Sequence, residues 1–127
     1  MELLYVAAPY RAKTTIQIQH NIYQASLMAQ FYWLKGYAVI CPHLNSANFD
    51  GLLGDKSFLE ATTLMQLKCT HSAFHPNWTT SSGCLIEYQN AVAAKQIIHF
   101  TNMDRIKRMI KNHFFTKTHI DDLRKGV

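Results

Sequence analysis

The sequence near the amino end reads Leu3-Leu4-Tyr5-Val6-Ala7-Ala8, a run of apolar residues that Pro9 closes. A short run that is apolar throughout predicts a β-strand buried on both faces. Tyr37-Ala38-Val39-Ile40-Cys41 is a second such run, closed by Pro42. Between them, apolar residues recur in steps of three and four from Ile18 to Trp33, which predicts an amphipathic helix. A strand, a helix and a strand in this order predict two parallel strands joined by a crossover.

The alternation of strands and helices continues along the chain. Thr14 or Thr15 is expected to cap the first helix and Gly36 to end it. Later elements are expected as a helix over Ser57–Lys68, a strand over Cys69–Phe74, a helix over Gly83–Lys95, a strand over Gln96–Phe100, and helical pieces over Met103–His113 and His119–Lys125. The order predicts one α/β domain over residues 1–127, with a core over 1–100 and a basic tail over 101–127. Its expected fold is a Rossmann- or flavodoxin-like parallel sheet of four to five strands, with helices on both faces and a helical C-terminal tail.

The composition fits a protein of the cytoplasm. The chain has 127 residues, of which 48% are hydrophobic, enough for one domain with a core. No stretch approaches the roughly 18 apolar residues of a membrane span, and no basic, cleavable leader follows Met1. The three cysteines form no C-x-x-C pair, which predicts buried thiols in a reducing cytoplasm, the host cytoplasm if a phage encodes the chain.

Basic residues gather in the tail and supply much of the net charge of +5. Such a face is usually solvated, and no motif that reads nucleic acid accompanies it, so nucleic-acid binding is expected only as a weaker alternative. His71 and His75 lie four residues apart but straddle the end of an expected strand, so we expect no metal site and no cofactor.

The segment Ser81-Ser82-Gly83-Cys84-Leu85-Ile86-Glu87 predicts a helix start with one carboxylate a turn inside. A helix N-terminus presents unpaired N–H groups and a partial positive charge, which suits a phosphate. Glu87 then stands where a nucleophile facing the same ligand belongs. The alternative is that the serine, glycine and glutamate only serve the start of the helix.

The topology brings further polar residues to the same place. Ligands of parallel α/β sheets bind beyond the carboxyl ends of the strands. Three loops are expected there, over residues 8–14, 43–56 and 75–83. One cleft would then collect residues that are distant in sequence, namely Tyr5, Arg11, His43, Asn45, Asp50, Ser81 and Glu87.

Several short motifs together resemble the nucleoside 2-deoxyribosyltransferase superfamily, in particular a small phage and bacterial branch of unknown function related to deoxynucleoside 5′-monophosphate N-glycosidase. The resemblance covers about residues 3–100, and its motifs are Tyr5-Val6-Ala7-Ala8-Pro9-Tyr10-Arg11, Gly36 to Asn45, Phe49-Asp50-Gly51, Phe58-Leu59-Glu60, Pro76-Asn77-Trp78 and Ser81-Ser82-Gly83 to Glu87.

The resemblance implies a nucleoside or nucleotide as the ligand and roles for particular residues. Glu87 would attack the anomeric carbon, and Ser81 with Gly83 would hold a 5′-phosphate. The turn of Tyr5, Ala8, Pro9 and Arg11 would lie against the sugar and phosphate. His43, Asn45 and Asp55 would line the same cleft, and Trp78 would stack on the base or else be buried at the foot of its loop. A homodimer or larger homo-oligomer is also implied.

The sequence departs from the family pattern around this cleft. Thr62 stands where active relatives carry an aspartate, and Ala8 and Asn77 stand where they carry glycines. Asp50, Asp55 or Glu60 could replace the missing acid, and Asp50 is taken as the catalytic candidate. Two functions follow as expectations: an N-glycosidase or deoxyribosyltransferase with Glu87 as nucleophile, or a catalytically impaired protein, possibly of a phage, that sequesters a nucleotide or a nucleotide-derived signal.

Overall fold

Four parallel strands form the sheet at the centre of the molecule. In this computed structural model, which describes the backbone of residues 1–125 and the side chains of residues 1–114, the strand order is β2-β1-β3-β4. The strands are β1 (Leu3–Ala7), β2 (Ala38–Ile40), β3 (His71–Phe74) and β4 (Ile97–Phe100). In register, Leu4 of β1 lies between Val39 and His71. The predicted single-domain, flavodoxin-like parallel sheet is thereby confirmed, with four strands.

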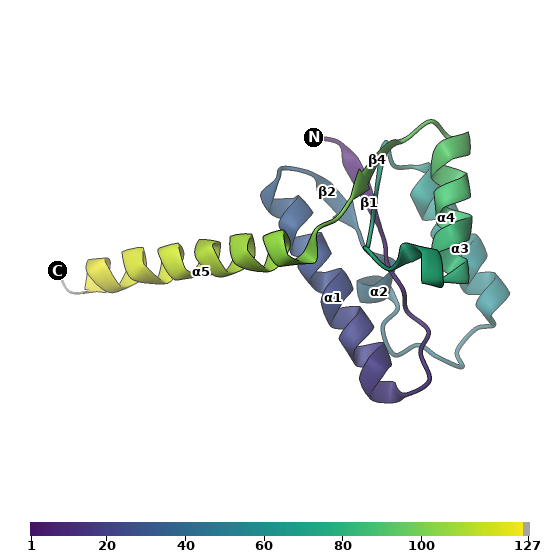
Figure 1. Cartoon of the computed structure of the whole chain (residues 1–127), viewed down its shortest axis with the longest axis horizontal. Coiled ribbons are helices and arrows are strands. Elements are labelled where there is room, and N and C mark those ends of the chain that lie inside the picture. Colours follow the sequence, from purple (N-terminus) through teal and green to yellow (C-terminus); the bar gives the residue numbers. More distant parts are fainter. Residues whose placement is uncertain (126–127) are drawn as a thin grey trace.

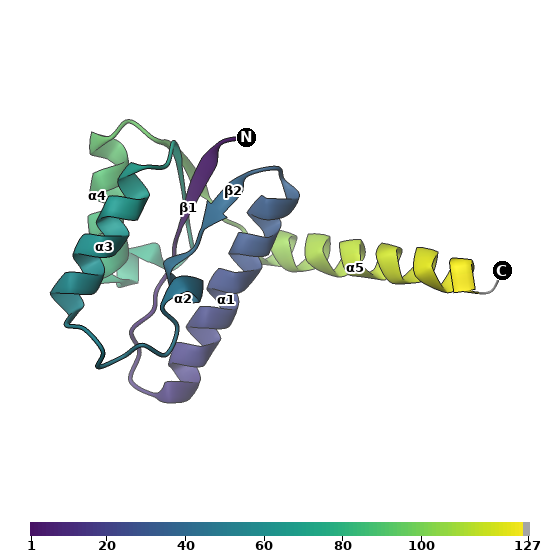
Figure 2. The same cartoon turned by 180° about the vertical axis from the view of Figure 1, so that it is seen from behind.

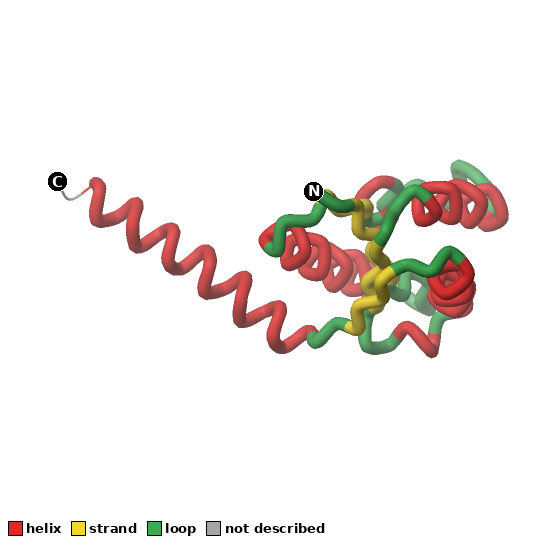
Figure 3. The backbone as a smooth tube through the Cα atoms, turned by 90° about the horizontal axis from the view of Figure 1, so that it is seen from above, coloured by secondary structure: helices red, strands yellow, loops and turns green. Residues whose placement is uncertain are grey.

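Helices cover both faces of this sheet (Figures 1 and 3). Helices α1 (Thr15–Leu34) and α5 (Met103–Lys125) pack against each other on one face, and α3 (Asp55–Leu67) and α4 (Ser82–Ala93) on the other. Two short helices, α2 (Pro42–Asn45) and η1 (Trp78–Thr80), follow β2 and β3. Within the described chain, no helix is both long and apolar enough to cross a lipid bilayer.

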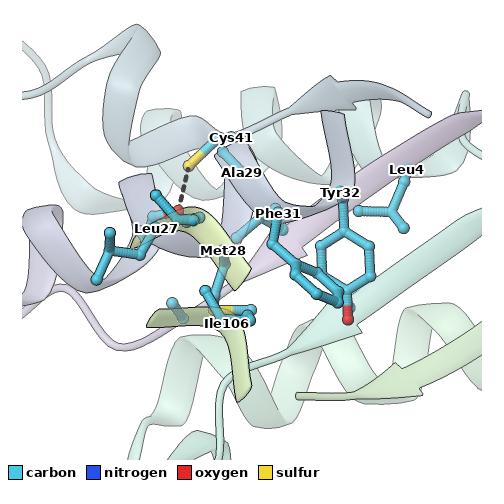
Figure 4. Close-up of a cluster of buried hydrophobic side chains, with 13 residues drawn as sticks. Leu4, Leu27, Met28, Ala29, Phe31, Tyr32, Cys41 and Ile106 are labelled. Atoms are coloured by element: carbon cyan, nitrogen blue, oxygen red, sulfur yellow. Dashed lines mark hydrogen bonds between the residues drawn. The ribbon is translucent and has the colours of Figure 1, made fainter. Parts of the chain in front are cut away.

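The alternation of side chains along β1 divides the core into two clusters. Leu4 and Val6 point to the face of α1 and α5, where they join Met28 and Ile106 among the buried side chains (Figure 4). The intervening Tyr5 and Ala7 point to the other face and pack with Phe74 and Ala91. Because β1 is buried on both faces, its sequence is apolar at every position, which is what made it recognisable; β3 is buried as well but includes the polar His71 and Ser72.

Local signals place the ends of the helices as expected. The Thr14 hydroxyl accepts a hydrogen bond from the Gln17 amide at 3.2 Å, and the Ser81 hydroxyl accepts one from the Cys84 amide at 3.2 Å. Gly36 has a φ of +100°, which allows the chain to turn sharply from α1 into β2. All three cysteines are buried free thiols.

Two sequence predictions about the helices are wrong, and one residue of the apolar repeat of α1 is exposed. Trp33 is 54% exposed, because the buried face of α1 is centred on Ala25, Met28 and Tyr32, and each step along a helix turns the side chain by about 100°. The expected loop after β2 contains α2, and α3 begins at Asp55 rather than at Ser57.

The tail differs from the two expected helical pieces. It forms one continuous helix, α5, whose carboxyl half projects away from the sheet in all three views (Figures 1–3). Lys117, Arg124 and Lys125 of the basic tail lie outside the described side chains.

Candidate functional site

A cavity of about 450 Å³ lies beyond the carboxyl ends of the strands, between α3 and α4. It is built from the segments that follow β1, β2 and β3, the convergence that the sequence predicted. Ten of the residues named from the sequence line it: Tyr5, Ala8, Pro9, Arg11, His43, Asp50, Asp55, Ser81, Gly83 and Glu87.

Two residues predicted to bind the ligand, Asn45 and Trp78, do not line this cavity. The Asn45 amide group lies 3.7 Å from the sulfur of Met65. Trp78 stacks on Tyr88, with ring centroids 4.6 Å apart, and also packs near Phe74 and Phe100. Trp78 is therefore part of the aromatic core beside α4, because the short helix η1 turns its ring toward the sheet and away from the cavity.

Glu87 brings a carboxyl group to the cavity from the second turn of α4. The residue is half-buried, and none of the ion pairs among the described side chains involves it. Burial raises the pKa of Glu87 from 4.5 to about 7, although the neighbouring Tyr5 hydroxyl and Cys84 thiol lower it in part. A carboxyl group in this state exchanges a proton near neutral pH, as groups in acid–base and nucleophilic catalysis do.

Tyr5 is fully buried and also lines the cavity, and its hydroxyl makes no hydrogen bond within the described part of the chain. Desolvation raises the pKa of Tyr5 well above its usual value, and the negative charge of Glu87 raises it further. The hydroxyl therefore stands within electrostatic reach of the carboxylate. Buried polar groups without a partner are rare, and such a group in a cavity points to a ligand that would complete it.

The N-terminus of α4 forms one wall. Ser81 caps it, and the amides of Ser82 and Gly83, which precede the first bonds of the helix, have no hydrogen-bond acceptor among the described residues. A Cβ at Gly83 would meet only the Ser81 hydroxyl oxygen, at 3.8 Å. Packing does not require a glycine here, so its main physical effect is to leave room in the cavity.

A network of charged and polar side chains closes the rim. Arg11 pairs with Asp55 and lies 3.6 Å from Asp50. The Tyr10 hydroxyl donates a hydrogen bond to Asp50 at 2.9 Å. Since Tyr10 and Arg11 follow β1 whereas the two aspartates precede or begin α3, the network fastens one loop to the other. All four residues line the cavity.

His43 and Thr62 take more structural positions. The buried His43 ring nitrogen Nε2 lies 3.0 Å from the Pro9 carbonyl oxygen, and burial lowers the pKa of His43. This geometry agrees with a histidine that fixes the turn after β1. Thr62 lines the same cavity as Glu87 and donates to the Leu59 carbonyl at 3.1 Å. Glu60 is exposed and lies away from the cavity.

A buried hydrogen-bond network, absent from the sequence predictions, supports the turn of α4 that carries Glu87. Gln66 is fully buried, and its amide nitrogen donates to the Glu87 carbonyl at 2.8 Å and to the Ser72 hydroxyl at 3.2 Å. Its amide oxygen accepts from Asn90 at 3.3 Å. Gln96 in turn donates to the carbonyl oxygens of Gln66 and Cys69. The sequence hint is a polar residue in an apolar stretch of α3, which alone does not reveal its partners.

The described side chains contain no group of three or more His, Cys, Asp or Glu that could hold a metal ion. A scan against protein-family models finds no match to this chain, and a search of curated proteins finds none either. Any assignment of function therefore depends on the cavity and on the sequence motifs that line it.

Proposed function

We propose that the protein acts on the N-glycosidic bond of a nucleoside or nucleotide, as an N-glycosidase or deoxyribosyltransferase, with Glu87 as the nucleophile. The observation that carries the proposal is the position of Glu87: an unpaired, desolvated carboxyl group in a cavity that also holds free helix-terminal amides and an arginine. The resemblance of residues 3–100 to the nucleoside 2-deoxyribosyltransferase superfamily supports the same assignment.

The chemistry suits a carboxylate in this environment. Breaking a glycosidic bond builds positive charge on the sugar ring, and a carboxylate beneath the anomeric carbon stabilises that charge or forms a covalent bond to the carbon. The desolvated surroundings strengthen the attraction. With a pKa of about 7, Glu87 is ionised and nucleophilic above neutral pH.

The N-terminus of α4 and Arg11 supply the proposed phosphate contacts. The amides of Ser82 and Gly83 would donate to phosphate oxygens, and the guanidinium group of Arg11 would add a two-pronged contact. The Tyr5 hydroxyl would donate to a sugar oxygen or to Glu87 itself once a ligand is bound. Asp50, at the rim, is the acid proposed to assist departure of the base.

The test is release of free base from a panel of deoxynucleosides and their 5′-monophosphates, followed by chromatography. The natural protein should release base from at least one substrate, and Glu87→Ala should abolish release while the cavity still binds the substrate. Glu60→Gln is the matched control, because this exposed glutamate lies away from the cavity. Absence of release from every substrate at high protein concentration would contradict the proposal.

The pH dependence separates two roles for Glu87. If Glu87 is the nucleophile, the rate rises with pH through about 7, as the carboxyl group loses its proton. If it instead delivers a proton to the base, the rate falls through the same range. A rate that falls with pH through about 7 in the natural protein would refute the nucleophilic role.

Thr62 favours a second candidate, a nucleotide-binding protein without turnover, because the position of the family aspartate faces the cavity but carries no acid. Binding should then raise the melting temperature without any release of base. A ligand at 100 times its Kd would stabilise the fold by about 2.7 kcal/mol, which a thermal-shift measurement detects. A homodimer or larger homo-oligomer is part of either proposal, and sizing chromatography tests it.

A further inference from the structure

A second cavity, of about 360 Å³, lies on the opposite face of the sheet from α3 and α4, between α1, β4 and α5. Aromatic rings form most of its walls, among them Phe31, Tyr32 and Tyr37. Lys35 and Arg105 are the charged residues that line it, and no carboxylate does so. The cavity therefore has aromatic walls and a net positive charge.

Neither cation is neutralised by a neighbouring acid. Among the side chains of residues 1–114, Lys35 and Arg105 make no ion pair. The Lys35 ammonium group lies 5.4 Å from the centre of the Phe31 ring. Arg105 lines the same cavity as Lys35 and the Tyr32 ring. Two positive charges thus face one cavity.

A chain of hydrogen bonds ends at His99 in this cavity. The Glu2 carboxylate lies 2.8 Å from Nε2 of the buried His71, and Nδ1 of His71 lies 2.9 Å from Nε2 of His99. A carboxylate only accepts hydrogen bonds, so His71 donates through Nε2, and in the tautomer with one ring proton it accepts through Nδ1. His99 then donates through Nε2. Its Nδ1, which has no hydrogen-bond partner among the described residues, is left to bind a proton or a ligand.

We propose that this cavity binds a tetrahedral oxyanion, the phosphate or sulfate group of a small ligand, between Arg105, Lys35 and the protonated Nδ1 of His99. Three cationic donors would then surround the anion. Thr101 and Asn102, just before α5, line the same cavity, and Asn102 caps the helix by accepting a hydrogen bond from the Arg105 amide. The aromatic walls favour an anion attached to a planar ring over the free ion.

Binding is coupled to protonation of His99. The groups that face it are His71 of β3, Glu2 through His71, Tyr32 of α1, Lys35 just after α1, Tyr37 before β2, and Arg105 of α5. In the free protein, burial and then His71 lower the pKa of His99. A bound anion favours the charged ring and raises that pKa, so the anion should bind more tightly at acidic pH and more weakly as the pH rises through the pKa of the complex.

Sulfate is the first probe, because it does not titrate in this pH range. Side-chain NMR of the histidines should show sulfate shifting the His99 signals and raising the pKa of its ring, whereas His43, which lines the Glu87 cavity, reports binding there instead. Arg105→Gln should weaken the sulfate Kd read at His99 by about tenfold. Arg108→Gln, an equal loss of charge at an exposed position of the same helix, should change it less than about twofold.

The remaining arms identify the source of the anion and test the hydrogen-bond chain. Tighter binding of phenyl phosphate than of inorganic phosphate at His99 assigns the site to a phosphate ester, and equal binding assigns it to the free ion. Glu2→Gln, which removes the charge that supports a protonated His99, should weaken sulfate binding at pH 6 and flatten its pH dependence, whereas His113→Gln at an exposed position of α5 should not. The proposal is overturned if sulfate leaves the His99 signals unmoved, or if Arg108→Gln and Arg105→Gln weaken binding equally.

Discussion

Two polar clusters flank the same turn of α4, and they satisfy their hydrogen bonds to different degrees. In the Gln66 network, the amide of Gln66 pairs with Ser72, Asn90 and the Glu87 carbonyl. In the cavity, the Tyr5 hydroxyl is buried without a partner and the Glu87 carboxyl group is desolvated without a cation. The first pattern is that of groups which hold a fold together, and the second is that of groups which await a ligand.

Glu87 belongs to both clusters. Its backbone carbonyl accepts from Gln66, whereas its side chain lines the cavity. The satisfied network therefore fixes the backbone from which the unsatisfied carboxyl group projects. A site built in this way has a rigid base, which is what precise placement of a reactive group requires.

The largest expected effect comes from breaking the satisfied cluster. Gln66→Leu removes the donor to the Glu87 carbonyl, the acceptor of the Asn90 amide and one of the hydrogen bonds of Ser72, and should lower the free energy of unfolding by on the order of 3–5 kcal/mol. Urea denaturation measures this. Gln89→Leu, at an exposed position of α4, is the control and should change the free energy by less than about 0.5 kcal/mol. Equal losses in both variants would show that the network contributes nothing special.

Removing the ionisable group of Glu87 should raise, rather than lower, the free energy of unfolding. The folded pKa of Glu87, about 7, exceeds the ordinary 4.5, so the folded state holds a proton that the unfolded state releases as the pH rises between these values. Stability is therefore lost over that window, by roughly 3 kcal/mol in total. Glu87→Gln should stabilise the protein by about that amount at pH 8 and by little near pH 4.5.

Denaturation curves at both pH values measure this difference. The exposed Glu60→Gln should leave the free energy of unfolding within about 0.5 kcal/mol of the natural protein at either pH. A destabilised Glu87→Gln at pH 8 would mean that the carboxylate already has a favourable partner in the fold.

Two buried tyrosines allow the same comparison of unpaired and paired groups, with smaller expected changes in the free energy of unfolding. Tyr5→Phe removes a buried hydroxyl without a partner, so the free energy of unfolding should stay constant or rise by up to about 1 kcal/mol, while nucleotide binding weakens. Tyr32→Phe removes a buried hydroxyl that lies 3.2 Å from the Thr101 hydroxyl, and should lose about 1 kcal/mol. Thermal melts with and without nucleotide distinguish the two variants. The opposite ranking would refute the assignment of Tyr5 to a ligand site.

The smallest effect is expected at the N-terminus of α4. Gly83→Ala places a methyl group in open space within a helix, which should raise stability by about 0.5 kcal/mol, yet the methyl group occupies the cavity and should weaken nucleotide binding. Gly36→Ala, at a φ of +100°, should instead destabilise the protein and leave the cavity unchanged. Unaltered nucleotide affinity in Gly83→Ala would move the ligand away from this wall.

The sequence predicted the elements that repeat a simple pattern. The doubly buried strand β1 and the cap at Ser81 were visible because each depends on neighbouring residues alone, whereas His71 and Ser72 made β3 a weaker prediction. The convergence of Tyr5, Arg11 and Glu87 followed from the topology of a parallel sheet.

What the sequence did not predict depends on tertiary contacts. Trp78 turns to the aromatic core because Phe74, Tyr88 and Phe100 surround it, and they come from separate segments. The partners of Gln66 and the chain from Glu2 to His99 join residues from different elements, with no local signal at either end. Periodicity within one helix or strand carries no information on such pairings.

Arg11 at the rim of the cavity already has carboxylate counter-ions, which an anionic ligand would have to replace. Arg11 is held by Asp50 and Asp55, so an anionic ligand that claims its guanidinium group must displace at least one carboxylate. The displaced aspartate lies before or at the start of α3, so its release weakens the contacts between that segment and the loop that follows β1. Ligands without a negative group would leave the ion pairs of Arg11 intact. The rim thus selects for charge before any contact with Glu87 is made.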